Sequence, residues 1–234
     1  MCIAGGRIDH LDTAKRPEGF RALRSTPGVR HLPSHEHLFF EGDIRDCVYV
    51  IDSGWVKLYR TLIDGQRQVV GFANGGSVLG MESEGEYVNG CEAVTPVTVR
   101  SIPVASIPEL CRVDSTFAEQ LLRQIGRQLG AAQSQLATVG AQSAEQKLAT
   151  FLLSIADLCG VTPDGDFDLP MRRGDMAEFL GLRLETVSRK MTEFQRRGWI
   201  RMTSLYHCRI LRRSVLEDLA QGGEPDCAPT RRAV

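Results

Sequence analysis

The feature that most constrains this chain is a run of apolar residues spaced alternately four and three positions apart. They are Ala118, Leu122, Ile125, Leu129, Ala132, Leu136 and Val139. This spacing is held for three heptads without a proline, so it predicts one long helix with an apolar seam. The seam either packs on the chain's own domain or pairs with a second copy, and the strict alternation favours a homodimer. The residues expected in the dimer contact are Leu122, Ile125, Leu129, Ala132 and Leu136.

The residues before this helix have the pattern of an antiparallel β-domain. From about 29 to 103, short apolar runs alternate with turns that contain glycine, as in 38–40, 47–51 and 56–59. Short strands with such regular turns predict a β-sandwich or β-roll. Residues 1–20 are polar and lack periodicity, and we expect a loose arm there.

The residues after the seam predict a winged helix-turn-helix. An amphipathic stripe from Leu148 to Leu158 indicates a first helix. It is followed by a short strand at best, a short helix at 174–180, a glycine turn, a second helix at 184–197, a hairpin and a last helix at 215–220. The stretch 222–234 is rich in glycine and proline and is expected to be disordered.

These patterns predict an α+β fold with five parts in chain order. They are an N-terminal arm (1–20), an antiparallel β-roll (21–114), a dimerisation helix (115–140), a winged helix-turn-helix domain (141–221) and a disordered tail (222–234).

Positive charge is concentrated between residues 172 and 213. This segment holds eleven basic and four acidic residues, a net charge of +7, whereas the remaining 17 basic and 25 acidic residues give −8. A basic segment in an otherwise acidic chain is typical of a protein that binds a polyanion. Because the charge coincides with the helix-turn-helix pattern, double-stranded DNA is the expected partner.

The second helix of this motif contains residues suited to base recognition. Glu185, Ser188 and Arg189 are spaced i, i+3 and i+4, so they share one face near the N-terminus of the helix. That end of a recognition helix enters the major groove, where arginine donates to guanine, glutamate accepts from cytosine and serine meets several base edges. The residues expected to contact phosphate are Arg172, Arg173, Arg183, Thr186, Lys190 and Arg196.

The stretch from Met171 to Arg189 resembles the DNA-binding signature of the CRP/FNR superfamily. Its core, Glu185-Thr-Val-Ser-Arg189, is similar to that of the FNR and FixK branch. Residues 144–149 resemble the helix after that family's hinge, and Gly42-Asp43 and 50–54 resemble its β-roll motifs. The resemblance spans about residues 20–220. It implies a roll of the cyclic-nucleotide-binding type and a homodimeric transcription activator that works with RNA polymerase. It also implies a TTGA-N6-TCAA-like palindrome as target, in genes of low-oxygen or nitrogen-oxide metabolism.

Two departures from the family's patterns bear on cofactors. FNR proper holds an iron–sulfur cluster on a group of N-terminal cysteines and one central cysteine, but this N-terminus offers only Cys2, and Arg100 stands at the central position. CRP holds cyclic AMP in a cassette that contains an arginine. The matching stretch 79–87 lacks that arginine and is rich in carboxylates, which repel phosphate. We expect a FixK-like protein without cyclic AMP or a cluster. A ligand-gated or redox-gated sensor of the same superfamily is the alternative.

Two further patterns suggest other chemistry. His35-Glu36-His37 with Glu41 imitates the first half of a cupin metal motif, so a cupin-like metal enzyme is a more distant alternative. No later histidine supplies the second half, and we expect no metal, no catalytic residue and no enzyme. Cys208 lies in the basic hairpin, where arginines would lower its thiol pKa, which makes it a candidate redox residue.

The remaining observations bear on location. The seven cysteines are at least 19 positions apart and match no zinc or cluster spacing. No run of 18 apolar residues indicates a membrane span. The first residues lack a basic segment followed by an apolar core, the pattern of a signal peptide. We expect a cytoplasmic protein with no membrane partner.

Overall fold

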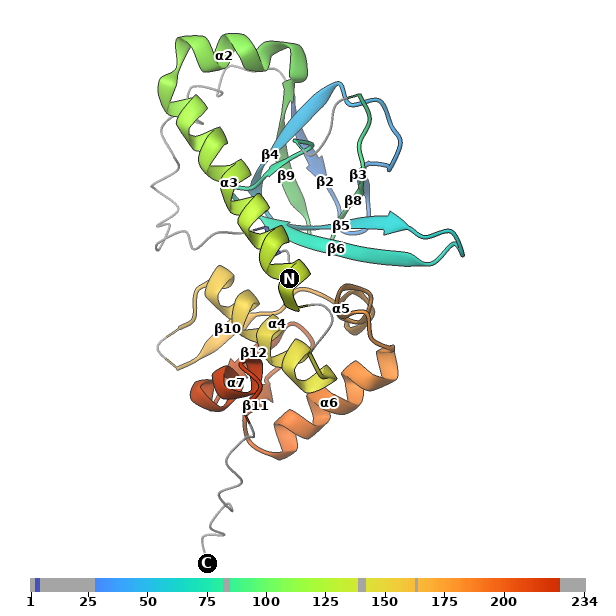
Figure 1. The fold of residues 1–234 in the computed structure, drawn as a ribbon, viewed down its shortest axis with the longest axis vertical. Coiled ribbons are helices and arrows are strands. Elements are labelled where there is room, and N and C mark those ends of the chain that lie inside the picture. The colour runs from blue at the N-terminus through green and yellow to red at the C-terminus, as the bar shows by residue number, and fades with distance from the viewer. Residues whose placement is uncertain (1–2, 5–27, 82–84, 139–141, 163, 224–234) are drawn as a thin grey trace, which may run out of the picture. The chain divides into compact units, whose positions relative to one another are not determined.

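The computed structural model describes residues 3–4, 28–81, 85–138, 142–162 and 164–223. The chain divides into two compact units, Met1–Val139 and Gly140–Val234. The first contains antiparallel sheets and a long helix, and the second contains helices and a small sheet, which confirms the predicted α+β fold (Figure 1).

The first unit is built on two sheets. The larger has the strand order β1-β6-β5-β8-β3 and the smaller the order β2-β9-β4-β7. All neighbours are antiparallel except β1 and β6, as expected for a roll. The strands are β1 (Ile3–Ala4), β2 (Val29–Leu32), β3 (His37–Phe39), β4 (Cys47–Ser53), β5 (Trp55–Thr61), β6 (Arg67–Asn74), β7 (Val78–Leu79), β8 (Gly90–Ala93) and β9 (Val97–Pro103).

The N-terminal arm is in part a strand, so the prediction of a loose arm is wrong there. Ile3 lies opposite Phe72, and Ala4 lies opposite Ala73, in a parallel pairing with β6. The backbone groups of β1 and β6 therefore bond to each other. Residues 5–20 lie outside the described part of the chain.

Strand β4 explains how the first unit holds both its interior and its long helix. Side chains alternate between the two faces of a strand. Tyr49 and Ile51 belong to the cluster inside the roll, whereas Val48 and Val50 belong to a second cluster that includes Phe117 of the long helix. The strand is thus buried on both faces, which accounts for its nearly continuous apolar sequence.

The long helix α3 (Ser115–Thr138) confirms the predicted helix. The chain reaches it through a 3-10 turn, η2 (Val104–Ser106), and α2 (Ile107–Val113). Phe117 and Leu121 of α3 pack on the roll. On that face the helix therefore packs against its own domain, which was one of the two alternatives for the seam. On a neighbouring face, the exposed fractions are 70% for Leu122, 39% for Ile125 and 58% for Leu129. The side chains of Ala132 and Leu136 lie outside the described ones.

The second unit has the predicted order of elements. Its three strands form an antiparallel sheet in the order β10-β12-β11. The elements are α4 (Ala144–Cys159), β10 (Asp166–Asp168), α5 (Arg173–Leu180), α6 (Leu184–Arg196), β11 (Ile200–Met202), β12 (His207–Ile210) and α7 (Arg213–Ala220). Gly222 and Gly223 follow α7, and residues 224–234 of the predicted disordered tail lie outside the described residues.

Helix α4 forms the interior of the second unit. A capping box starts it, since the Ser143 N–H donates to Gln146 Oε1 (2.5 Å) and the Gln146 N–H donates to Ser143 Oγ (3.3 Å). Its apolar stripe is fully buried from Leu148 to Ile155 and half-buried at Leu158. The Phe151 ring packs against Phe179 of α5 with centroids 5.5 Å apart. The buried face of α4 is therefore the surface on which the other helices of this unit pack.

Candidate nucleic-acid interface

The turn between α5 and α6 has the tight geometry that the sequence predicts. Gly181 ends α5 with a φ of +62°, in the left-handed region that favours glycine. The Leu182 N–H donates to Ala177 O at 3.0 Å, which satisfies one of the last carbonyls of α5. The two helices therefore meet in a helix-turn-helix.

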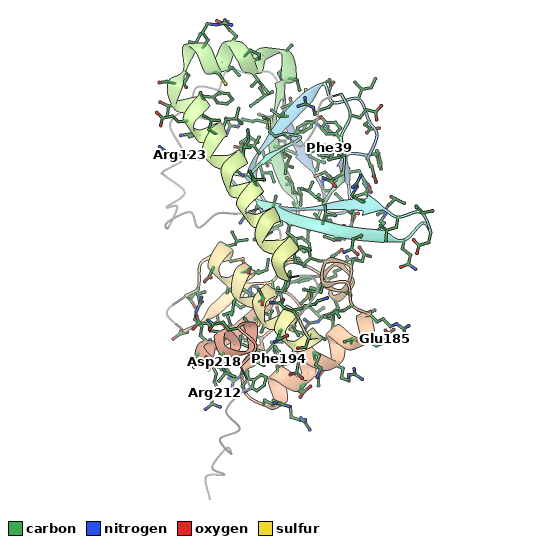
Figure 2. The ribbon with its side chains drawn as sticks, viewed as in Figure 1. Phe39, Arg123, Glu185, Phe194, Arg212 and Asp218 are labelled. Carbon is green, nitrogen blue, oxygen red and sulfur yellow. The ribbon has the colours of Figure 1, made fainter. Side chains whose placement is uncertain are left out.

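Helix α6 has one buried and one exposed face. Val187, Met191 and Phe194 are at most 1% exposed, and the Phe194 ring lies 5.1 Å from that of Trp199. Glu185, Ser188 and Arg189 are exposed. Figure 2 places Glu185 at the edge of this unit and Phe194 inside it. The structure thus brings the three predicted base-reading residues onto one solvent face.

Arg183 occupies the N-cap position of α6. The N–H groups of Thr186 and Val187 donate to its carbonyl at 3.0 and 3.1 Å. Its side chain makes no capping hydrogen bond and is exposed. Because serine or threonine would cap a helix at this point, the arginine leaves its guanidinium free for another contact. Thr186 itself is half-buried.

Several predicted phosphate contacts have unpaired charges. Arg172, Arg183 and Arg196 are exposed, and within the described chain none of their guanidinium groups has a carboxylate partner. The same holds for Arg201 on β11 and for Arg212 before α7, two residues that the sequence prediction did not include among the contacts. In the sequence, Arg201 and Arg212 are marked only by the positive charge of their segment. That charge does not show which arginines pair with a carboxylate and which do not.

Two other predicted phosphate contacts have different surroundings. The half-buried Arg173 donates from Nη1 to Met176 Sδ at 3.7 Å, and burial lowers the pKa of its guanidinium. The Lys190 ammonium lies between two carboxylates, Glu145 of α4 and Glu193, the latter 2.9 Å away. Their charges are therefore less open to DNA than those of the exposed arginines.

Acidic residues outside the basic segment neutralise part of its charge. Arg209 donates to both carboxylate oxygens of Asp166 on β10. Arg213 pairs with Asp157 of α4 at 2.8 Å. These pairs hold the small sheet and α7 in place, so the charge that faces a polyanion is smaller than +7.

The surroundings of Cys208 contradict the expectation of a reactive thiol. Cys208 is 0% exposed on β12, and burial raises its thiol pKa to about 12. Arg173 lowers this pKa, but its effect is smaller than that of burial. The prediction of a lowered thiol pKa is therefore wrong, because burial of Cys208 raises the pKa by more than Arg173 lowers it.

We expect Cys208 to resist alkylation in the folded protein. At pH 8, a pKa of about 12 leaves roughly one thiol in ten thousand ionised, against roughly a quarter for a free cysteine. Iodoacetamide should label Cys208 at least about a hundredfold more slowly in native than in unfolded protein, as measured by mass spectrometry. The rate should rise with pH, because more thiolate forms as the pH approaches the pKa. Equal labelling of both forms would contradict this assignment.

The histidine pair of the suggested cupin motif lies in a charge cluster. His35 Nδ1 and His37 Nε2 lie 3.3 and 3.6 Å from the buried Glu92, which also pairs with Lys57 and Arg67. Two cations next to the carboxylate disfavour a metal ion there. The described residues contain no group of three or more ligating side chains arranged for a metal. Nor does any helix among them have the length and apolarity to cross a membrane.

Comparisons with known proteins agree with a β-roll followed by a helix-turn-helix. Residues 29–114 match the cyclic nucleotide-binding domain family, and residues 146–219 match the Crp-like helix-turn-helix domain family. The chain is 38% identical to the nitrogen fixation regulation protein FixK of Bradyrhizobium diazoefficiens over 73% of both chains. It is 39% identical to the transcriptional activatory protein AadR of Rhodopseudomonas palustris, over 72% of this chain and 71% of AadR. The structure of FixK2 from Bradyrhizobium japonicum superposes with a TM-score of 0.75 and 28% identity, over 82% of this chain and 96% of FixK2.

Proposed function

The chain belongs to the CRP/FNR family, as a DNA-binding transcription regulator of the FNR/FixK type rather than an enzyme, and from this premise we propose that it binds a TTGA-N6-TCAA-like palindrome as a homodimer. The observation that carries the proposal is the exposed face of α6. There Glu185, Ser188 and Arg189 point to solvent while the opposite face holds the helix in the core. Such a helix can enter the major groove without disturbing the fold.

We assign each of the three residues a role in base reading. Arg189 donates to the guanine of TTGA, and Glu185 accepts from a cytosine amino group on the opposite strand. Ser188 lies against the outer thymine, where a longer side chain would crowd the methyl group. The absence of a carboxylate partner for Arg189 within the described residues supports this role, because its guanidinium has no competing ion pair.

We assign the backbone contacts to the exposed arginines. Arg172, Arg183 and Arg196 are proposed to bind phosphate, with Thr186 beside them at the start of α6. Arg173 is proposed as a partly buried member of the same set. Phosphate contacts fix the register of the protein on DNA without reading its sequence.

The homodimer proposal is supported by the exposed stripe of α3. Leu122, Ile125 and Leu129 are apolar, exposed and spaced for a helix–helix seam. Pairing with the same face of a second copy would remove this stripe from water. Two recognition helices would then meet half-sites about 34 Å apart, which matches a palindrome.

We further propose that the regulator acts without a cofactor. Arg100, at the place of the central cluster ligand in FNR, is 7% exposed, and its Nε and Nη2 donate to Asp52 at 2.8 to 3.0 Å. Stretch 79–87 contains no arginine or lysine to hold a nucleotide phosphate. Tyr87 at its end stacks on Phe39 with ring centroids 3.9 Å apart, inside the roll.

Purified protein is accordingly expected to be colourless and to bind the palindrome in air without cyclic AMP. Fluorescence anisotropy with a labelled TTGA-N6-TCAA duplex measures this directly, and a scrambled duplex is the control. Cyclic AMP should change the affinity less than about twofold. If cyclic AMP tightened binding more than about tenfold, worth ~1.4 kcal/mol, the interpretation that residues 79–87 hold no nucleotide phosphate would be wrong. A visible absorption band in anaerobically purified protein would overturn the absence of a cluster.

The cellular role follows the relatives. FixK is named for the regulation of nitrogen fixation, and AadR is named as an activator. We propose that this chain, in the cytoplasm where DNA and RNA polymerase are found, contacts RNA polymerase at promoters of low-oxygen or nitrogen-oxide metabolism.

A further inference from the structure

The first turn of α4 contacts both helices of the helix-turn-helix. Glu145 accepts from the Lys190 ammonium of α6, and Lys147 Nζ donates to Leu180 O, at the end of α5, at 3.3 Å. The capping box of Ser143 and Gln146 fixes where this turn begins. One short segment therefore sets the positions of α5 and α6 relative to α4.

Lys190 lies at the centre of a row of charges. Its side chain is 21% exposed, and those of Glu145 and Glu193 are 27% and 18% exposed. Glu193 also pairs with Arg197 at 2.6 Å, and the Arg197 guanidinium lies 4.8 Å from the centre of the Trp199 ring. The row thus runs from α4 across α6 to the residue that precedes β11.

We propose that Glu145 is a positioning residue for base recognition, which holds α6 through Lys190, and that Lys190 does not bind phosphate. The proposal rests on the DNA-binding function proposed above. It assigns sequence-specific affinity to a residue outside the helix-turn-helix and reassigns the lysine that sequence reasoning placed on the DNA backbone.

The charges around Lys190 favour its pairing with the carboxylates over binding to a phosphate. Hydrogen bonds from the ammonium to Glu145 and Glu193 raise the pKa of Lys190, and the same lysine lowers the pKa of Glu193. A phosphate that approached the ammonium would also meet the carboxylates of Glu145 and Glu193, and like charges at short range repel. Arg189 and Arg196 on the same helix have no such neighbours within the described residues.

The test compares nearly isosteric variants of the full chain, Glu145→Gln and Lys190→Gln. Each is titrated against the palindrome and a random duplex at two salt concentrations. Both should bind the palindrome roughly tenfold more weakly, because α6 loses its fixed position. Binding to random DNA and the salt dependence of affinity should stay at wild-type values, since no phosphate contact is lost.

A charge swap and a matched control separate positioning from phosphate binding. Glu145→Lys with Lys190→Glu rebuilds the pair and should restore palindrome binding to within about twofold of wild type. Arg196→Gln, from an exposed cation on the same helix, should weaken both duplexes and lower the salt slope by about one unit. The swap also decides the question if a single variant fails to fold.

Two results would contradict the positioning role of Glu145. Wild-type affinity in Glu145→Gln would overturn the proposal, as would a swap that stays defective on both duplexes with a lower salt slope. If wild-type protein does not prefer the palindrome at all, the proposed function fails instead, which is a separate outcome.

Discussion

Exchanging Ile125 and Leu129 for aspartate is expected to turn the proposed dimer into monomers and to weaken palindrome binding at least about a hundredfold. Both side chains lie on the exposed stripe of α3, so the substitutions leave the roll intact. In a dimer they would place four carboxylates in a dry apolar contact, where each charge costs several kcal/mol. A monomer also loses the gain from engaging two half-sites at once. Light scattering and DNA titration measure the two effects.

A control comes from another exposed apolar side chain. Ile63, in the turn between β5 and β6, is fully exposed and lies outside the seam. Ile63→Asp should leave both the mass and the affinity unchanged. If the double variant of α3 remains dimeric with an unchanged thermal midpoint, the assignment of the seam is wrong.

Arg189→Ala should remove discrimination at the guanine of each half-site. The loss is about 1–3 kcal/mol per half-site, because the bidentate contact disappears while the phosphate contacts remain. The measurement is the affinity for the palindrome and for a duplex with both guanines replaced. Wild type should prefer the palindrome strongly, and the variant should bind both duplexes nearly alike.

The matched variant is Arg196→Ala. It removes an exposed cation from the other end of α6, and it should weaken binding to both duplexes by the same factor. A variant at Arg189 that still rejects the substituted duplex as strongly as wild type would refute the readout assignment.

The long helices are predictable from the sequence because their signals are local. The seam predicts α3, and the expected bounds of 115–140 begin at Ser115, where the helix starts. The Asp114 carboxylate accepts the N–H groups of Thr116 and Phe117 at 2.9 and 3.1 Å, which caps the helix at this start. The face of α6 is likewise set by spacing within a few turns.

Other elements lack a periodic signal. All four residues of β8 are buried, so the strand shows no alternation, and it contains Glu92, whose charge is balanced by Lys57 and Arg67 from β5 and β6. The seven-residue α2 contains Pro108 and has no fully buried face.

At the interface, the spacing of residues predicts which side chains share a face but not which charges are already paired. Glu145 and Lys190 are 45 positions apart, and only the packing of α4 on α6 brings them together. The same reason applies to Cys208, whose charged neighbours in the sequence suggested an acidic thiol while its burial makes the thiol less acidic.

Competition between two duplexes tests the central claim most directly. One contains TTGA-N6-TCAA, and the other has both half-sites scrambled at the same length and base composition. In air, at physiological salt and without cyclic AMP, wild-type protein should bind the first at least about a thousandfold more tightly, as specific DNA-binding proteins do. Equal affinity for the two duplexes would contradict sequence-specific binding to this palindrome.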